Sequence, residues 1–242
     1  MKIYLSCTAN LGDFSNALPV MSGLAKSKNE KIDLIIKSGM RKFNGIKEFL
    51  MLQDDLFESV SFDNDIFLYG YIIEMSSWTR FDRNSPIRPI ETCRYENWVR
   101  DKYGLDFEVD DDFEIKVPKL DIDYHEDKII MGDRWSEKED PSIDARRKTY
   151  VLKDSGKFDD SKVHYLNYSD DVTTNVSLIK YNPNTLYTTF TGIGIVADLL
   201  KKDLVVYWDD DVRMWDGHPV QYDFERHYYG DRNGKLVYIG DA

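Results

Sequence analysis

The segment that decides the fold class opens the chain: Lys2-Ile3-Tyr4-Leu5-Ser6-Cys7-Thr8-Ala9-Asn10-Leu11-Gly12-Asp13. Its apolar run, Ile3 to Cys7, predicts a short buried strand. A turn over residues 8–12 follows, and then a helix from Asp13 to Lys26, with a kink or a late start at Pro19. The apolar residues of that helix recur at helical spacing: Phe14, Ala17, Leu18, Met21 and Leu24.

The alternation of strand and helix continues, which is typical of an α/β layer with a parallel sheet. It predicts strands at Ile32–Lys37, Phe57–Phe62 and Phe67–Ile73, and helices at Phe43–Gln53 and at Glu91–Tyr103, the latter capped by Gly104. The pattern restarts after residue 127. It predicts strands at Lys128–Met131, Thr149–Lys153, Val163–Asn167, Leu186–Phe190 and Leu204–Trp208. It also predicts helices at Val172–Tyr181 and Ile193–Lys202, and a hairpin at Asp231–Gly234.

An acidic segment, Phe107 to Asp123, separates the two runs and contains Val117-Pro118. It is typical of a connector. We therefore place a domain boundary there, with residues 1–118 in an N-terminal domain and residues 119–242 in a C-terminal domain.

Composition excludes several classes of protein. Of 242 residues, 42% are hydrophobic and 31% charged, which is typical of a globular protein with a real core. The formal net charge of −12 argues against a general binder of nucleic acid or anionic membrane. No apolar run is long enough to span a membrane, no signal peptide is recognised, and Cys7 and Cys93 form no framework. We expect a cytoplasmic protein with reduced thiols and no membrane insertion.

The turn Asn10-Leu11-Gly12-Asp13 is the first candidate site, because ligands of open α/β sheets bind at the carboxyl ends of the strands. Gly12 permits close approach of a ligand to the backbone. Asp13 has two interpretations that the sequence leaves open. It is either an ordinary helix N-cap or a general base that points into the cleft.

The segment Thr189-Phe190-Thr191-Gly192-Ile193-Gly194-Ile195-Val196-Ala197 is the second candidate site. It joins a strand to a helix, so free backbone N–H groups at the helix start suit a phosphate. The alternative is a tight turn whose glycines serve packing. The segment also matches G-x-G-x-x-A, and Asp209 to Asp211 follow the next strand, so an NAD(P)-binding oxidoreductase stays open.

A third candidate is Met131-Gly132-Asp133-Arg134-Trp135, in which Arg134 could bind a phosphate and Trp135 could stack on a base or sugar. The acidic runs Asp110–Asp112 and Asp209–Asp211 are either solvated loops or metal ligands. The four histidines show no metal-ligand spacing, so we expect no metal site.

These residues resemble the lipopolysaccharide heptosyltransferase-like glycosyltransferases. The likeness lies in the opening strand, the Leu11-Gly12-Asp13 turn and a helix with Pro19, and again at Gly132 to Trp135 and Thr191-Gly192-Ile193-Gly194. The resemblance implies a GT-B fold, which consists of two Rossmann-type halves with parallel sheets facing a central cleft. It also implies metal-independent transfer of a sugar, with Asp13 as general base and the donor held by Gly12, Gly132, Arg134, Thr191, Gly192, Ile193 and Gly194.

The sequence departs from that family at two points. Phe190 stands where the family has an acidic residue, and Ile195 and Val196 stand where it has a histidine. The chain is also shorter than a standard member. This is typical of an enzyme that has lost some elements and diverged, for example one encoded by a phage.

We expect a glycosyltransferase that moves a hexosyl, pentosyl or heptosyl group from a nucleotide sugar, its co-substrate, to a hydroxyl acceptor, with no further cofactor. The acceptor is a glycan or, in one alternative, hydroxymethylated phage DNA. The net charge of −12 argues against a DNA acceptor, although the middle segment is locally basic, with Arg80, Arg83, Arg88, Arg94 and Arg100. Ordinary surface charge is the alternative interpretation of these arginines. A non-catalytic nucleotide-binding module is the non-enzymatic alternative.

Overall fold

A computed structural model describes residues 1–6, 10–66, 70–76, 88–132, 156–167, 169–189, 191–208, 224–225, 228–229 and 234–238. The described residues form two parallel sheets, with strand orders β3-β2-β1-β4 and β6-β5-β7-β8-β9. The first sheet and its helices make the first half of the molecule: β1 (Lys2–Leu5), α1 (Leu11–Lys28), β2 (Ile32–Ile36), a 3₁₀ turn (Ser38–Lys42), α2 (Ile46–Met51), β3 (Phe57–Phe62), β4 (Ile73–Met75) and α3 (Ile90–Tyr103).

The second half is built in the same way around the other sheet. Its elements are β5 (Ile129–Gly132), a 3₁₀ turn (Asp160–Lys162), β6 (Val163–Tyr165), α4 (Val172–Tyr181), β7 (Leu186–Thr188), α5 (Gly192–Leu199), β8 (Leu204–Trp208) and β9 (Gly234–Tyr238). The predicted fold class, α/β with two parallel sheets, is confirmed.

Most predicted elements are present, with changed ends. The helix cap at Gly104 is confirmed, since this residue has φ +62° and its N–H donates to the carbonyl of Arg100. The strand predicted at Phe67–Ile73 is displaced, and its residues 67–69 lie outside the described part of the chain. Ile73 begins β4 rather than ending a strand, because Ile73 and Met75 are the side chains that reach the core while Tyr71 is 71% exposed.

The C-terminal hairpin predicted at residues 231–234 falls mostly outside the described residues. Gly234 begins β9, whose described neighbour is the parallel strand β8 rather than an antiparallel partner. The predicted strand at 149–153 also lies outside the described part of the chain, and the domain boundary near residue 118 stays a prediction.

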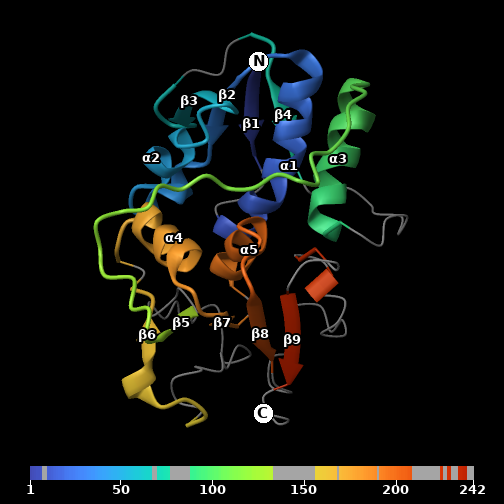
Figure 1. Cartoon of the computed structure of the whole chain (residues 1–242). Coiled ribbons are helices and arrows are strands. Elements are labelled where there is room, and N and C mark those ends of the chain that lie inside the picture. The colour runs from blue at the N-terminus through green and yellow to red at the C-terminus, as the bar shows by residue number, and fades with distance from the viewer. Residues whose placement is uncertain are drawn as a thin grey trace, which may run out of the picture.

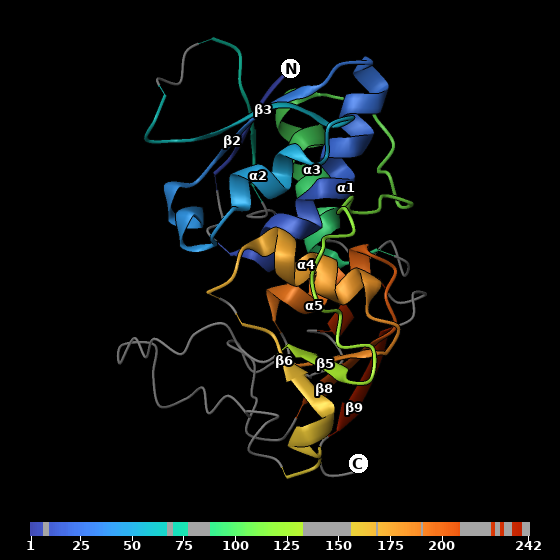
Figure 2. The same ribbon diagram turned by 60° about the vertical axis from the view of Figure 1, so that its left-hand side comes forward.

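The helices α4 and α5 lie between the helices of the first half and the second sheet, as both views show (Figures 1 and 2). The N-terminus lies at one end of the molecule, and the last described strand, β9, lies in the other half (Figure 1). The acidic connector between α3 and β5 passes across α1 on its way to the second half (Figure 1).

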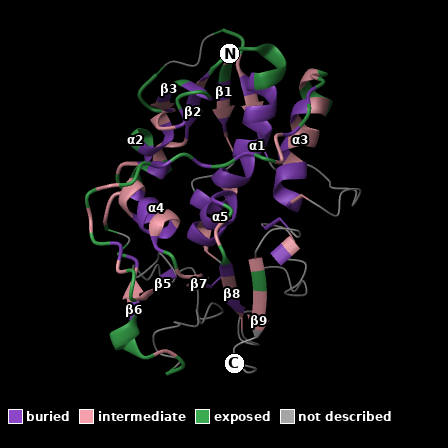
Figure 3. Cartoon of the chain, viewed as in Figure 1, coloured by how far each residue is buried: buried purple, intermediate pink, exposed green. Residues whose placement is uncertain are grey.

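The helix α1 is buried along most of its length, from Leu11 to Ala25 (Figure 3). Because almost every face of the helix is covered, polar residues such as Ser15 and Asn16 are buried along with the apolar ones. The Ser15 hydroxyl donates to the carbonyl of Leu11 at 2.7 Å, so burial leaves its proton paired. Pro19 lies inside the helix without ending it, and its carbonyl accepts from the N–H of Asp110 in the connector.

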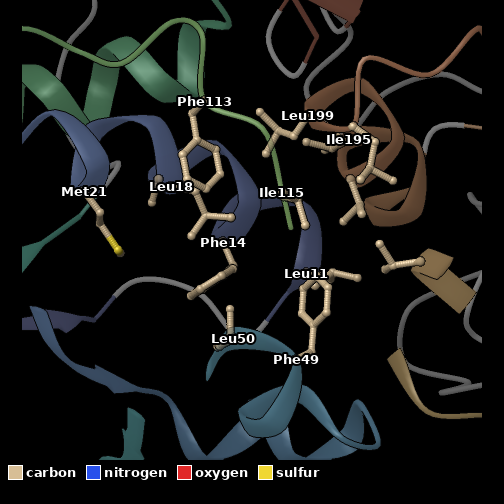
Figure 4. Close-up of a cluster of buried hydrophobic side chains, with 14 of the residues drawn as sticks. Leu11, Phe14, Leu18, Met21, Phe49, Leu50, Phe113, Ile115, Ile195 and Leu199 are labelled. Atoms are coloured by element: carbon tan, nitrogen blue, oxygen red, sulfur yellow. The ribbon is translucent and has the colours of Figure 1, made fainter. Parts of the chain in front are cut away.

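One hydrophobic core runs through both halves. The same cluster contains Leu5 of β1, Phe14 of α1, Val196 of α5 and Val206 of β8. Figure 4 shows the middle of this cluster, where Leu11 and Phe14 lie near Ile115 of the connector and Ile195 of α5. Burial of apolar surface therefore stabilises the two halves jointly, at about 25 cal/mol per Å² removed from water.

The closest approach of the halves is at two glycines. A Cβ on Gly192 would stand 2.7 Å from the backbone nitrogen of Gly12, and a Cβ on Gly12 would stand 2.7 Å from Ile195 Cδ1 and 3.2 Å from Gly192 Cα. The first turns of α1 and α5 thus touch backbone to backbone. Only residues without a side chain allow this distance.

Backbone hydrogen bonds hold the halves together at two further places. The N–H of Val172, at the start of α4, donates to the carbonyl of Asn44 at 2.9 Å. The connector is bound on both sides: the N–H of Ile115 donates to the carbonyl of Leu199, and Gln53 exchanges two hydrogen bonds with the backbone of Lys116.

Cys93 is a buried free thiol on α3, and burial raises its pKa to about 11. A thiol with so high a pKa is a poor nucleophile. Cys7 lies outside the described residues. Among the helices that the structure describes, none is both long and apolar enough to cross a bilayer.

Two stacked histidines join the connector to the edge strand β6. The rings of His125 and His164 lie 3.9 Å apart between centroids, and His125 Nδ1 lies 3.0 Å from Asp123 Oδ2. Burial lowers the pKa of His164, and the nearby His125 and Lys128 lower it further. The folded state therefore favours the neutral imidazole of His164.

We expect Gly12→Ala to lower the free energy of unfolding by about 1–3 kcal/mol, because the new methyl group overpacks the contact between α1 and α5. Ile195→Val alone should cost about 0.5–1.5 kcal/mol. Since valine has no Cδ1, the double variant should lose less than the sum. Urea unfolding of all four proteins measures this, and strictly additive losses would contradict the contact.

We also expect acid to destabilise the protein in part through His164. Its folded pKa is lowered, so its contribution to stability is full above the unfolded pKa of about 6.5 and is lost as pH falls through the lower folded pKa. Urea unfolding at pH 7 and pH 5 should show a smaller loss for His164→Gln than for the wild-type chain. Equal losses would show that His164 titrates alike in the folded and unfolded states.

Candidate functional site

The candidate site lies where the turns after β1 and β7 meet. Each turn leads from the carboxyl end of a strand into a helix, and the first turns of these helices, α1 and α5, touch at Gly12 and Gly192. The carboxyl ends of parallel strands are where open α/β sheets bind ligands. The structure therefore brings together the two segments that the sequence singled out, which are about 180 residues apart.

Asp13 is not the N-cap of its helix. The cap is Asn10, with extended φ −113° and ψ 138°, and Asp13 is the third residue of α1. The N-cap interpretation is therefore wrong, because the helix starts two residues earlier than the apolar pattern predicted. Asp13 is partly exposed and directly follows Gly12, whose backbone contacts α5.

The candidate donor residues of the second half gather around one buried hydroxyl. Gly132 ends β5 and is paired in register with Thr188 of β7. Thr188 Oγ1 lies 2.6 Å from the carbonyl oxygen of Gly132 and 2.9 Å from Thr191 Oγ1. Gly132 and Thr191 are thereby held at one edge of the sheet.

The start of α5 offers two backbone donors. The N–H of Gly194 donates to the carbonyl of Thr191 at 3.1 Å. The N–H groups of Gly192 and Ile193 donate to no acceptor within the described residues. The side chain of Ile193 is only 2% exposed and belongs to the core, so this residue can serve a ligand through its backbone alone.

The glycines of this site have packing reasons of their own. The space beside Gly12 is filled by Ile195 and Gly192, and a Cβ on Gly194 would stand 2.6 Å from the hydroxyl oxygen of Tyr228. Close packing therefore explains why Gly12 and Gly194 have no side chain. The groups that could bind a ligand at this edge are the N–H groups of Gly192 and Ile193, the Thr191 hydroxyl and the Asp13 carboxylate.

Three residues that support the site were not found from the sequence: Thr188, Asp198 and Tyr228. Asp198 of α5 is 2% exposed and accepts from the N–H of Tyr229 at 2.9 Å. Burial, reinforced by Asp198, raises the pKa of Tyr228, so its phenol stays neutral behind Gly194. No local pattern marks these residues, because each acts on a partner distant in the chain.

Several predicted site residues lie outside the described part of the chain: Arg134, Trp135, Phe190 and Asp209 to Asp211. The other acidic run is structural. Asp110 is 2.6 Å from the Lys26 ammonium, and Asp111 pairs with Arg88. Among the described residues there is no group of three or more His, Cys, Asp or Glu side chains that could hold a metal ion.

Two cavities lie away from this edge. One, of about 290 Å³, is lined at the amino ends of β5 and β6 by residues that include Ile129, Phe158 and Val163. The other, of about 370 Å³, lies beside the connector at Lys116 and Lys180. We prefer the edge at Gly12 and Gly192 as the site, because it holds Asp13 and the two N–H groups of α5 that have no acceptor among the described residues.

Solved structures with a similar fold are glycosyltransferases. A family 9 glycosyl transferase from Veillonella parvula aligns over 99% of this chain and 86% of its own, with a TM-score of 0.54 at 10% identity. The E. coli heptosyltransferase WaaC, in a structure with ADP, covers 98% and 93%, with a TM-score of 0.52 at 9% identity. The ADP-heptose LPS heptosyltransferase II of E. coli covers 98% and 90%, with a TM-score of 0.51 at 12% identity.

The chain has a GT-B glycosyltransferase fold. No model of a known protein family matches the sequence, and no curated protein matches it either. At about 10% identity the likeness concerns the fold, so the activity has to be argued from the site. Within the GT-B fold, the site described above lies where the two halves meet.

Proposed function

We propose that this protein transfers a sugar from a nucleotide sugar to a hydroxyl acceptor, with Asp13 as the general base. The observation that supports it is the contact between Gly12 and Gly192. Asp13, whose side chain is partly exposed, directly follows Gly12, and Gly192 opens α5, whose first two N–H groups have no acceptor among the described residues. A transferase that joins a hydroxyl to an activated sugar needs a proton acceptor and a site for the leaving anion.

The N–H groups of Gly192 and Ile193 would bind the diphosphate of the donor. They stand at the positive end of α5, where both the peptide dipoles and the unpaired donors favour an anion. As the bond between sugar and diphosphate breaks, negative charge grows on the leaving oxygen. Donors already in place stabilise that charge without reorganising, which is the strongest form of electrostatic catalysis.

Asp13 would take the proton of the acceptor hydroxyl as its oxygen attacks the anomeric carbon. Proton transfer to a positioned carboxylate contributes about 10²–10⁴-fold to a rate. The residue lies in the first half and the donor turn in the second, so the acceptor would reach the sugar from the side of α1. Gly12 would set the spacing between the two groups.

The finer features of the proposal come from the sequence and the resemblance. They are a phosphate contact from Arg134, transfer without a metal, and a phage origin. The transferred group would be a hexosyl, pentosyl or heptosyl group, and the acceptor a glycan or hydroxymethylated DNA. The WaaC structure with ADP makes ADP and its sugars the first donors to test. They should be compared with UDP, GDP and CMP, with sugars of these nucleotides, and with NAD and NADP.

A thermal-shift panel of these ligands tests the binding part of the proposal. A ligand at 100 times its dissociation constant adds about 2.7 kcal/mol of stability, which is a readable shift. Stabilisation by one nucleoside diphosphate and its sugars is expected. Stabilisation by NAD or NADP alone would favour an oxidoreductase instead. Binding without turnover in the presence of varied acceptors would favour a non-catalytic module.

We expect Asp13→Asn to lower the transfer rate by at least about 10²-fold while nucleotide-sugar binding stays within about twofold, because the amide cannot accept the proton. Released nucleoside diphosphate measures the rate, and calorimetry measures the binding. Asp127→Asn is the matched control, since Asp127 is an exposed carboxylate at the opposite edge of the second sheet. Unchanged transfer in Asp13→Asn would refute the assignment of the base.

A further inference from the structure

The hydroxyl of Thr188 lies at the centre of the candidate donor turn. This side chain is fully buried, and its Oγ1 contacts three oxygen atoms. The carbonyl oxygen of Gly132 is at 2.6 Å, Thr191 Oγ1 at 2.9 Å and the carbonyl oxygen of Thr189 at 3.0 Å. The contacts join the end of β5, the end of β7 and the N-cap of α5.

The chemistry of these atoms decides where the protons lie. A hydroxyl carries one proton, and a carbonyl oxygen can only accept. The shortest contact, between Thr188 and the Gly132 carbonyl, therefore uses the proton of Thr188, with the Thr189 carbonyl as a longer second acceptor. The contact between the two hydroxyls must then use the proton of Thr191, which points inward to Thr188.

The lone pairs of Thr191 are left for another partner. Thr191 is the N-cap of α5, but its side chain makes no capping hydrogen bond, and the N–H of Gly194 uses the Thr191 carbonyl instead. The residue is partly exposed. Its hydroxyl oxygen is thus an accessible acceptor whose proton is already engaged.

A second observation shows that this turn lacks a polar partner. The Thr189 side chain is 6% exposed, and its hydroxyl has no hydrogen-bond partner within the described residues. Buried hydroxyl groups are nearly always paired, with protein or with an ordered molecule. Among the described residues, this hydroxyl is therefore open to a further polar partner.

We propose that Thr191 recognises a hydroxyl group of the bound nucleotide sugar by accepting its hydrogen bond, and does not donate to the diphosphate. The assignment rests on the proposed function and divides the donor site into two parts. The N–H groups of Gly192 and Ile193 hold the anion. Thr191 reads a neighbouring hydroxyl of the ribose or sugar, and Thr188 is the positioning residue that takes up the proton of Thr191.

Two probes separate these parts. Inorganic pyrophosphate has no ribose or sugar, whereas a nucleotide sugar also carries the alcohol hydroxyl groups of both. Calorimetry first identifies the tightest binder among ADP-glucose, UDP-glucose and GDP-mannose, and that ligand is used as the nucleotide sugar. The affinity of pyrophosphate is then measured by its competition with this ligand. We expect Thr191→Val to weaken binding of the nucleotide sugar about 3- to 10-fold, the loss of one hydrogen bond, and to leave pyrophosphate binding unchanged.

The outcomes distinguish this inference from the proposed function. Weakening of both ligands by Thr191→Val, or of neither, would overturn the role of Thr191 while the proposed function stands. Failure of pyrophosphate to compete would overturn the role of the two N–H groups. Absence of nucleotide-sugar binding by the wild-type chain would refute the proposed function and this inference with it.

Two further variants test the positioning role of Thr188. Thr188→Ser keeps the hydroxyl and should bind the nucleotide sugar like the wild type. Thr188→Val frees the proton of Thr191 and should weaken the nucleotide sugar as Thr191→Val does, with thermal unfolding as the check on folding. Thr174→Val, a partly exposed threonine on α4, is the matched control. Equal loss in the serine and valine variants would mean that Thr188 acts by packing alone.

Discussion

The contact between Gly12 and Gly192 is the constraint on which the rest of the molecule depends. Two backbones from opposite halves approach so closely that a single methyl group on either would meet an atom at 2.7 Å. Because this contact lies at the first turns of α1 and α5, it fixes both helices at their amino ends. The apolar residues that follow on each helix then pack into one continuous core.

A shared core has consequences for the site. In a protein whose halves pack separately, the turns after β1 and β7 would change their spacing whenever the halves moved. Here the connector is also hydrogen-bonded to both halves, through Leu199 on one side and Gln53 on the other. The spacing between Asp13 and the start of α5 is therefore set by packing and backbone hydrogen bonds. Such preorganised groups suit charge stabilisation.

Buried polar side chains hold the turns in place by hydrogen bonds, as the glycine contact holds the helices in place by packing. Thr188 ties three elements at the donor edge, and Asn182 donates through its amide to the carbonyls of Tyr124, His125 and Lys128. Both side chains are fully buried, so each would be costly if its partners were lost. Each of these two side chains therefore joins segments that are distant in the chain.

Local sequence patterns were enough to predict the alternation of strands and helices along the chain, the α/β class, the Gly104 cap and the two candidate binding turns. These follow from apolar periodicity and turn residues, which act over a few neighbouring positions. Only the tertiary structure decided the strand orders, the place of Asp13 inside α1, and the meeting of Gly12 with Gly192. It alone showed the contact between the hydroxyls of Thr188 and Thr191. Such contacts join residues distant in the chain, or depend on how one hydroxyl shares its proton, and no local pattern encodes either.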